Sequence, residues 1–174
     1  MATTYTLISS NILSSSAASI TFSSIPATYT DLVLRISARS DASSFYDFLQ
    51  LRINGLSTTI YSDTTLYAAL TPLSTNGSNV AQLYSPRFSV NGASSTSTTF
   101  ASTEVYIPSY TASQNKPLSG FGVTETNASD DAYKSVGAGL IRETGAITSI
   151  VLNLITGPNF VSGSSFYLYG ISNA

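Results

Sequence analysis

The sequence has no cysteine, no histidine and no tryptophan among its 174 residues. Without cysteine and histidine it cannot form a Ser-His-Asp or Cys-His nucleophile, a thiolate or imidazole zinc site, a CxxC redox motif or a histidine-ligated haem. Charge is scarce too, since only 9% of residues are Asp, Glu, Lys or Arg, with a formal net charge of −2. We expect no nucleic-acid ligand, because phosphate binding needs a cluster of Lys and Arg.

Long apolar runs and a basic leader are also missing. The longest strongly apolar stretches, such as Ile150–Ile155, are far shorter than the ~20 residues of a membrane helix. No Lys or Arg precedes Arg35, so we expect no secretory signal peptide. These features predict a soluble chain, made in a cytosol, with no membrane partner.

Hydroxyl and aromatic side chains are abundant instead. The chain has 32 Ser and 22 Thr, together 54 of 174 residues, and also 11 Tyr and 8 Phe. At 18.3 kDa a chain can bury roughly 70% of its unfolded surface, so it needs no disulfide or metal for stability. No Pro-, Gly- or Ser-rich linker divides it, which predicts a single domain over residues 1–174. Its nearly neutral surface favours association between copies.

Period-two alternation is the main structural signal. In Asp31–Arg39 it sets Leu32, Leu34, Ile36 and Ala38 on one face and Val33, Arg35, Ser37 and Arg39 on the other. Asp47–Ile53 repeats the pattern, with Leu49, Leu51 and Ile53 inward. Further strands are expected at Thr4–Ser9, Ser19–Ser23, Arg87–Val90, Phe100–Ile107, Leu118–Thr126, Tyr133–Arg142, Ile147–Ile155 and Ser165–Ile171. About ten short strands without crossover helices predict an all-β, antiparallel two-sheet β-sandwich, with the jelly roll as the preferred topology.

Several connections can be predicted from turn residues. Asn54-Gly55 suits a type I′ turn, so we expect Leu56–Tyr61 to return against Asp47–Ile53 as a hairpin. Val90–Ala93 is expected to be a second tight turn, and Asn76-Gly77 a loop. Leu66–Leu70 is compatible with either a short helix or a strand. The glycines of Gly120–Gly122 and Gly137–Gly139 have no phosphate-loop spacing, and close packing or a bulge explains them better.

A pair of carboxylates is the enzymatic arrangement that this composition still permits, as in glycoside hydrolysis. The candidates are Glu104, Glu125, Asp130, Asp131, Glu143, Asp41 and Asp47. No spacing brings two of them to the separation of roughly 5–10 Å that such mechanisms use. Solvated loop charges are the better interpretation, and we expect no catalysis and no catalytic residue.

Two further groups of side chains suggest binding. Asn127–Asp131, preceded by Glu125, offers several oxygen ligands for Ca²⁺, but it lacks the EF-hand pattern, and an ordinary Asx turn is favoured. We therefore expect no metal and no cofactor. Tyrosines can stack on sugars or anchor an interface, although they also suit the rim of a sandwich core. The candidates are Tyr61, Tyr67, Tyr84, Tyr106, Tyr110, Tyr133, Tyr167 and Tyr169, of which the last two share a face opposite Phe166 and Leu168.

Four segments carry a resemblance to a known group of proteins. They are Ala18–Pro26 (ASITFSSIP), Tyr29–Arg39 (YTDLVLRISAR), Tyr106–Tyr110 (YIPSY) and Phe166–Ile171 (FYLYGI). Together they resemble small Ser/Thr-rich β-sandwich virion structural proteins of tailed bacteriophages. The resemblance implies a protein of the particle's outer surface, either a capsid decoration (cement) protein or part of a tail fibre. It supplies no site residues.

Composition and resemblance lead to one expectation about function. We expect a decoration protein at the virion surface, assembled in the host cytoplasm, that bridges major capsid subunits and stabilises the head. Its partners would be other virion proteins and copies of itself, as a homotrimer at symmetric junctions of the shell. The alternative is a tail-fibre or receptor-binding module that recognises host surface carbohydrate through aromatic and hydroxyl side chains.

Overall fold

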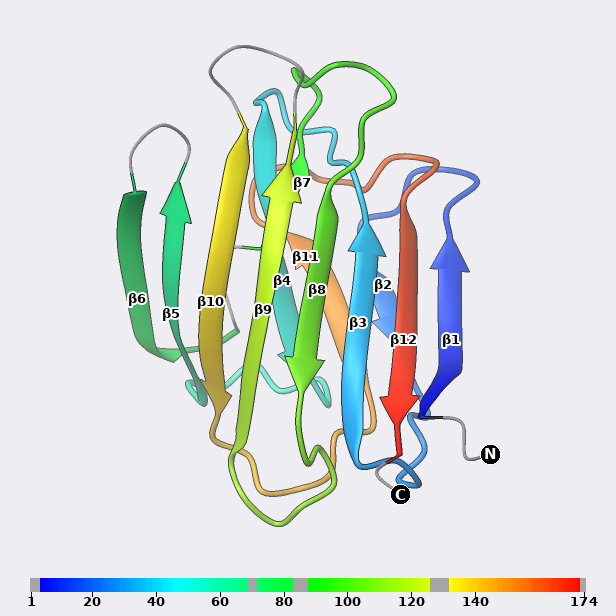
Figure 1. Ribbon diagram of the computed structural model, residues 1–174, viewed down its shortest axis with the longest axis vertical. Helices are drawn as coiled ribbons and strands as arrows, with labels where there is room; N and C mark the ends of the chain where they lie inside the picture. The colour runs from blue at the N-terminus through cyan, green and yellow to red at the C-terminus, as the bar shows by residue number, and fades with distance from the viewer. Residues whose placement is uncertain (1–3, 69–71, 83–87, 126–131, 173–174) are drawn as a thin grey trace.

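The computed structural model describes residues 4–68, 72–82, 88–125 and 132–172, and within these the chain forms twelve strands in two antiparallel sheets (Figure 1). The large sheet contains, in spatial order, β1 (Tyr5–Ile12), β12 (Ser165–Ile171), β3 (Asp31–Ser37), β8 (Ser102–Ile107), β9 (Lys116–Thr124), β10 (Tyr133–Ile141), β5 (Tyr61–Ala68) and β6 (Pro72–Val80). The small sheet contains β2 (Ile20–Phe22), β11 (Ile150–Leu154), β4 (Tyr46–Ile53) and β7 (Ser89–Asn91). The predicted all-β antiparallel sandwich is confirmed.

The hydrophobic core lies between the two sheets. Leu34 of β3, Leu168 of β12 and Leu51 of β4 belong to this core, and each is at most 3% exposed. Alternation explains these positions, because every second side chain of a strand points to the same face. Fully burying a side chain of this size stabilises the fold by about 1.5–3 kcal/mol. The predicted inward faces of β3 and β4 are confirmed.

The predicted hairpin at Asn54-Gly55 is wrong. Both residues have the expected positive φ, 51° and 67°, but Leu56–Tyr61 does not return along β4. β4 pairs instead with β11 and β7, while β5 starts at Tyr61 in the large sheet. The reason lies in the Asn54 side chain, which donates to the Ala146 carbonyl (2.8 Å) and accepts from the Thr148 amide (2.8 Å). The turn is thus tied to the loop before β11, and the chain crosses to the other sheet.

Two other expected connections also differ from the structure. Asn91 is the last residue of β7 rather than part of a tight turn, because its backbone pairs with Tyr46 of β4. Asn76-Gly77 lies inside β6, which is paired with β5, so the expected loop is a strand. The ambiguous segment Leu66–Leu70 is strand as far as Ala68, and Ala69 and Leu70 lie outside the described residues.

The position of Arg39 also differs from the one that alternation predicted. The regular strand ends at Ser37, and Arg39 is buried, with 9% exposure, rather than facing solvent beside Arg35. Its guanidinium donates hydrogen bonds to four carbonyl oxygens of the connection between β7 and β8, at distances of 2.8–3.1 Å. Burial lowers the pKa of Arg39. Arg39 therefore holds this long connection in place.

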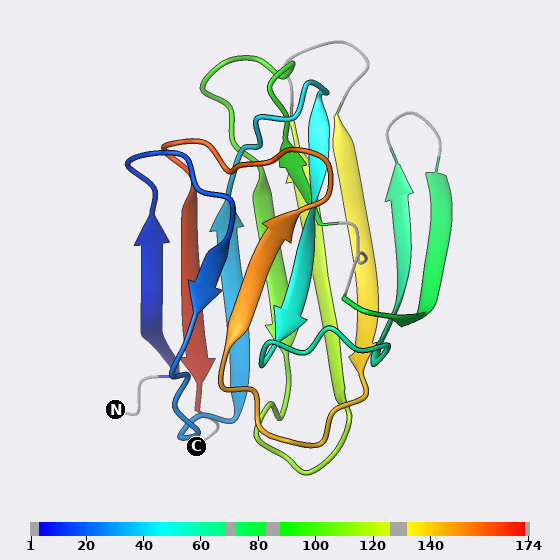
Figure 2. The ribbon, with the colours of Figure 1, turned by 180° about the vertical axis from the view of Figure 1, so that it is seen from behind.

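The jelly roll remains a prediction. Without β5, β6, β9 and β10, the strands β1-β12-β3-β8 and β2-β11-β4-β7 remain, two sheets of four strands each, as a jelly roll would have. The four additional strands are consecutive pairs in the chain, and all of them extend the large sheet. Seen from behind, β5 and β6 stand beyond the edge of the small sheet (Figure 2).

Glycine in β9 permits a close approach between strands. A Cβ atom on Gly120 would lie 2.3 Å from the carbonyl oxygen of Glu104 and 2.7 Å from the ring of Phe88. Only a residue without a side chain fits there. This agrees with the close packing expected for the glycines of this segment.

Candidate functional site

The small sheet packs on one face of the large sheet, and the opposite face, here called the outer face, points toward the viewer in Figure 1. Strand register places one residue from each of six neighbouring strands in a row across this face. In spatial order the row is Tyr167, Arg35, Glu104, Phe121, Val136 and Leu66. One end of the row is aromatic, the middle is charged and the other end is apolar.

An ion pair occupies the middle of the row. Arg35 and Glu104 are direct cross-strand partners on β3 and β8, and Nε of Arg35 lies 3.0 Å from Oε2 of Glu104. Their side chains are 58% and 33% exposed. Such an exposed pair adds only about 0–1 kcal/mol to stability. Its more useful property is chemical, since it places donors and acceptors side by side with no net charge.

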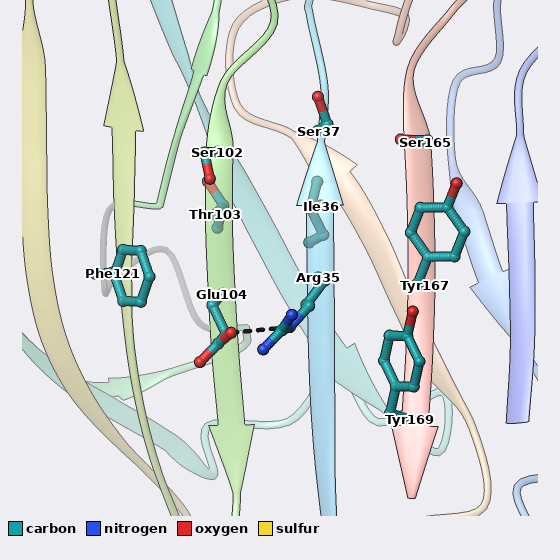
Figure 3. Close-up of a pocket in the computed structure, with 10 residues that line it drawn as sticks. All are labelled: Arg35, Ile36, Ser37, Ser102, Thr103, Glu104, Phe121, Ser165, Tyr167 and Tyr169. Carbon is teal, nitrogen blue, oxygen red and sulfur yellow. Dashed lines mark ion pairs between the residues drawn. The ribbon is translucent and has the colours of Figure 1, made fainter. Parts of the chain in front are cut away.

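Two tyrosines of β12 form an aromatic wall beside this pair. The rings of Tyr167 and Tyr169 have centroids 6.4 Å apart and an angle of 28° between their planes. The ring of Tyr5 on β1 meets Tyr169 edge-on, at 6.4 Å and 69°. Figure 3 shows the rings of Tyr167, Tyr169 and Phe121 nearly face-on. The two tyrosines are partly exposed, and Phe121 is 44% exposed.

Between the aromatic rings lies a shallow groove with a volume of about 420 Å³. We call it the tyrosine groove. It is lined by Arg35, Ile36, Ser37, Ser102, Thr103, Glu104, Phe121, Ser165, Tyr167 and Tyr169. The pair Arg35 and Glu104 lies between Tyr167 and Tyr169 on one side and Phe121 on the other (Figure 3).

The other half of the outer face carries an apolar patch, defined as Leu66, Phe121, Val123 and Val136. Their exposed fractions are 58%, 44%, 36% and 63%. Val136 is the cross-strand partner of both Phe121 and Leu66, so three of the four side chains are direct neighbours. The patch lies on β5, β9 and β10, three of the four strands that extend the large sheet.

Tyr106 and Asp31 close the lower end of the outer face near the start of β3. The Tyr106 hydroxyl donates to Oδ2 of Asp31 at 2.8 Å, and the amide of Ser109 donates to Oδ1 at 2.8 Å. Burial, and then the neighbouring Asp31 carboxylate, raise the pKa of Tyr106. Asp31 is itself buried, at 5% exposure, so this arrangement anchors the connection after β8.

Of the acidic candidates, Asp41 and Asp47 both bind the turn after β11. Asp47 is 1% exposed and accepts hydrogen bonds from the amides of Phe48, Thr156 and Gly157 and from a serine hydroxyl. Asp41 accepts from the backbone and side-chain nitrogens of the nearby Asn159. Both carboxylates hold the turn. The expected solvated loop charge fits the exposed Asp41 but is wrong for Asp47, which is buried in β4 because four hydrogen-bond donors surround its carboxylate.

The remaining acids are dispersed or lie outside the described residues. Glu104 is in the ion pair on the outer face, and Glu143 accepts from the Gly145 amide at 2.7 Å. Glu125 is exposed just after β9, and its carbonyl accepts from the side chain of Asn91. Asn127–Asp131, with Asp130 and Asp131, falls outside the described ranges. Among described residues no three His, Cys, Asp or Glu are grouped as metal ligands.

The candidate tyrosines divide between the core and the outer face. Tyr61, Tyr110 and Tyr133 are buried, Tyr67 stacks on Tyr133, and Tyr84 lies outside the described residues. Tyr106, Tyr167 and Tyr169 belong to the outer face, and the predicted common face of the last two is confirmed. Burial raises the pKa of Tyr61 and Tyr110, as it does for Tyr106.

Sequence reasoning missed Arg35 and Phe121 as members of this site. Alternation did place Arg35 on the solvent face of β3, but its pairing with Glu104 depends on the register between two strands far apart in the chain. Phe121 is an aromatic residue between two glycines, a signal that could have marked it as exposed.

No helix in the described part of the chain has the length and apolarity needed to cross a bilayer. No protein-family model, curated protein or solved structure matches the chain.

Proposed function

We propose that the chain is a structural protein of a bacteriophage particle, namely a capsid decoration protein that bridges major capsid subunits on the virion surface. The observation that carries this proposal is the apolar patch on the uncovered outer face of the large sheet. The resemblance of four segments to virion structural proteins supplies the kind of particle. The proposed partner is the major capsid protein, which forms the shell.

The patch has the composition of an interface core. Leu66, Phe121 and Val136 form a continuous row of exposed apolar side chains, and apolar surface of this kind commonly marks a binding site. Burying one such side chain from its half-exposed state is worth about 1 kcal/mol, half of the value for complete burial. Four of them would therefore contribute about 4 kcal/mol to binding.

The half of the outer face that carries the apolar patch is the part that would meet the shell. The four strands β9, β10, β5 and β6 at about 4.8 Å spacing span about 14 Å, and strands of nine residues at about 3.3 Å each extend about 30 Å. Their product is about 430 Å², a small contact for one copy, which the many copies on a shell would multiply. Burial of such an area against two shell subunits would add free energy to the shell and oppose internal genome pressure. Three copies at a threefold junction are the proposed oligomer.

Copy number in the particle tests the proposal. Purified particles of the phage that encodes the chain are separated on a denaturing gel, and the band is quantified against the major capsid protein. A decoration protein gives one copy for every few capsid subunits, whereas only a few copies per particle would contradict this role. That result would favour the alternative, a tail-fibre or receptor-binding module.

Variants connect the copy number to the apolar patch. Replacing both Leu66 and Val136 by serine should reduce the copies retained on particles by at least tenfold, with little change in stability because both side chains are exposed. Ile12→Ser is the matched control, since Ile12 is 64% exposed but lies on β1 at the far edge of the sheet. Equal retention of the two variants would show that the patch does not bind the shell.

A further inference from the structure

The walls of the tyrosine groove offer flat apolar surfaces. Tyr167 and Tyr169 stand on β12 and Phe121 on β9, with β3 and β8 forming the floor between them (Figure 3). Three strand spacings separate the walls, which is about 14 Å. Because the planes of the two tyrosine rings differ by only 28°, the rings form one nearly continuous strip. Such a strip can cover the apolar face of a ring-shaped ligand.

The floor of the groove is polar and has no net charge. Nε of Arg35 pairs with Oε2 of Glu104, and within the described part of the chain no other hydrogen bond engages the terminal guanidinium nitrogens of Arg35 or Oε1 of Glu104, so these atoms can meet a ligand. Donors and acceptors therefore stand side by side, which suits neighbouring hydroxyl groups, since each of these can donate and accept. The hydroxyls of Ser37, Ser102 and Ser165 line the same groove.

A protein surface would fit this floor poorly. Docking one would strip water from the pair of Arg35 and Glu104, and the desolvation cost of such a pair can exceed its electrostatic gain. A ligand that carries its own hydroxyls replaces the lost water contacts. The apolar patch shares Phe121 with the groove, but Leu66, Val123 and Val136 do not line the groove and have no such charged floor.

We infer that the tyrosine groove binds a neutral oligosaccharide of hexopyranose units, which lies with its sugar rings against Tyr167 and Tyr169 and its hydroxyls on Arg35 and Glu104. The inference goes beyond the proposed role in the capsid. The groove's volume of about 420 Å³ is within the usual range for ligand sites. Because the groove is open and shallow, a single site should bind with a dissociation constant on the order of 1 mM. Many copies on one particle would raise the overall avidity by about 10²–10⁴.

The test is a titration of the ¹⁵N-labelled protein, followed by amide chemical shifts, with cellohexaose, maltohexaose and laminarihexaose, each up to roughly 10 mM. At least one of these should give saturable shifts that centre on residues 35, 104, 167 and 169. The absence of saturable shifts with all three sugars would overturn the inference. Saturable shifts centred on another surface would overturn it as well.

Substitutions assign the binding to individual side chains. Tyr169→Ala should weaken sugar binding about tenfold, whereas Tyr169→Phe keeps the aromatic face and should stay within about twofold. Arg35→Gln and Glu104→Gln change exposed side chains, so these variants should fold even if Tyr169→Ala does not. Each should weaken sugar binding about fivefold. Unchanged affinity in these folded variants would refute the assignment.

The two proposals fail separately. The Leu66 and Val136 double variant should bind sugar like the unaltered chain but be lost from particles. Tyr169→Phe should behave like the unaltered chain in both assays, and Arg35→Gln should be retained on particles while its sugar affinity falls. Sugar binding that disappears with the apolar patch and not with Arg35 would contradict the inference while leaving the decoration role intact.

Discussion

Replacement of Arg39 by methionine tests how a buried cation stabilises the long connection between β7 and β8. The terminal nitrogens of Arg39 donate to the carbonyls of Ala93 (3.0 Å), Ser95 (2.8 Å), Thr96 (2.8 Å) and Thr99 (3.1 Å). Methionine keeps a flexible apolar stem of similar length and removes all of these donors. The loop should then lose its attachment to the end of β3.

The magnitude follows from opposing contributions. A hydrogen bond from a charged group contributes about 1.5–3 kcal/mol, but the four here share one side chain and are not additive. Loss of the charge also relieves the desolvation that lowers the pKa of Arg39. We expect the free energy of unfolding to fall by about 3 kcal/mol. For a chain of this length that corresponds to a decrease in Tm of about 6–12 °C.

Urea denaturation followed by tyrosine fluorescence measures this change, since the chain has no tryptophan. Arg35→Met is the matched control, because Arg35 is 58% exposed and makes one surface ion pair, so its loss should cost less than about 1 kcal/mol. Hydrogen exchange at residues 93–99 should accelerate in Arg39→Met alone. If the two variants lose the same stability to within about 0.5 kcal/mol, the anchoring role is refuted.

Three further predictions concern anchors elsewhere in the fold. Asp47→Ala should lower the free energy of unfolding by about 3 kcal/mol, because three backbone amides and one hydroxyl would lose their acceptor. Asp41→Ala, at an exposed position, should lower it by less than about 1 kcal/mol. Equal losses for the two variants in urea denaturation would contradict this prediction. Gly120→Ala should lower the free energy of unfolding by about 2 kcal/mol or more, because the new Cβ would clash with a backbone oxygen at 2.3 Å. Gly55→Ala should lower it by about 1 kcal/mol, because no atom lies within 4 Å but the φ of +67° is unfavourable for alanine. A larger loss in Gly55→Ala than in Gly120→Ala in urea denaturation would rule out the clash. Stability should fall as the pH rises above 10, because the three tyrosines with a raised pKa stay protonated in the folded chain after the unfolded chain has ionised. Burial lowers the pKa of Lys116 and of Arg39, and these two groups act in the opposite direction, so three groups are opposed by two. A Tm that stays flat or rises above pH 10 would contradict the expected balance.

Local patterns were enough to predict most of the strands and their faces, but not β5 and β6. Alternation in β3 and β12 correctly separated core residues such as Leu34 and Leu168 from outward residues such as Arg35 and Tyr167. These features depend only on the period of the strand, which neighbouring residues encode.

The partners of each strand could not be predicted in the same way. Asn54-Gly55 has the backbone of a hairpin turn, yet its side chain binds a loop more than ninety residues later and the chain changes sheet. The candidate groove has the same origin, since Arg35 and Glu104 meet only through the register of β3 and β8. Arg39 illustrates another limit, because nothing in the alternation marked Ser37 as the end of the strand.

The pairing of β12 with both β1 and β3 has a consequence for biosynthesis. During translation the apolar side chains of β3 cannot be covered by β12, because β12 is translated more than a hundred residues later. The nascent protein therefore cannot complete its core stepwise, and folding has to follow synthesis, on the order of milliseconds to seconds for such a non-local all-β topology. Rapid production of many copies would leave these unfinished chains exposed to one another, so yield should depend on temperature and expression rate more than on the stability of the finished fold.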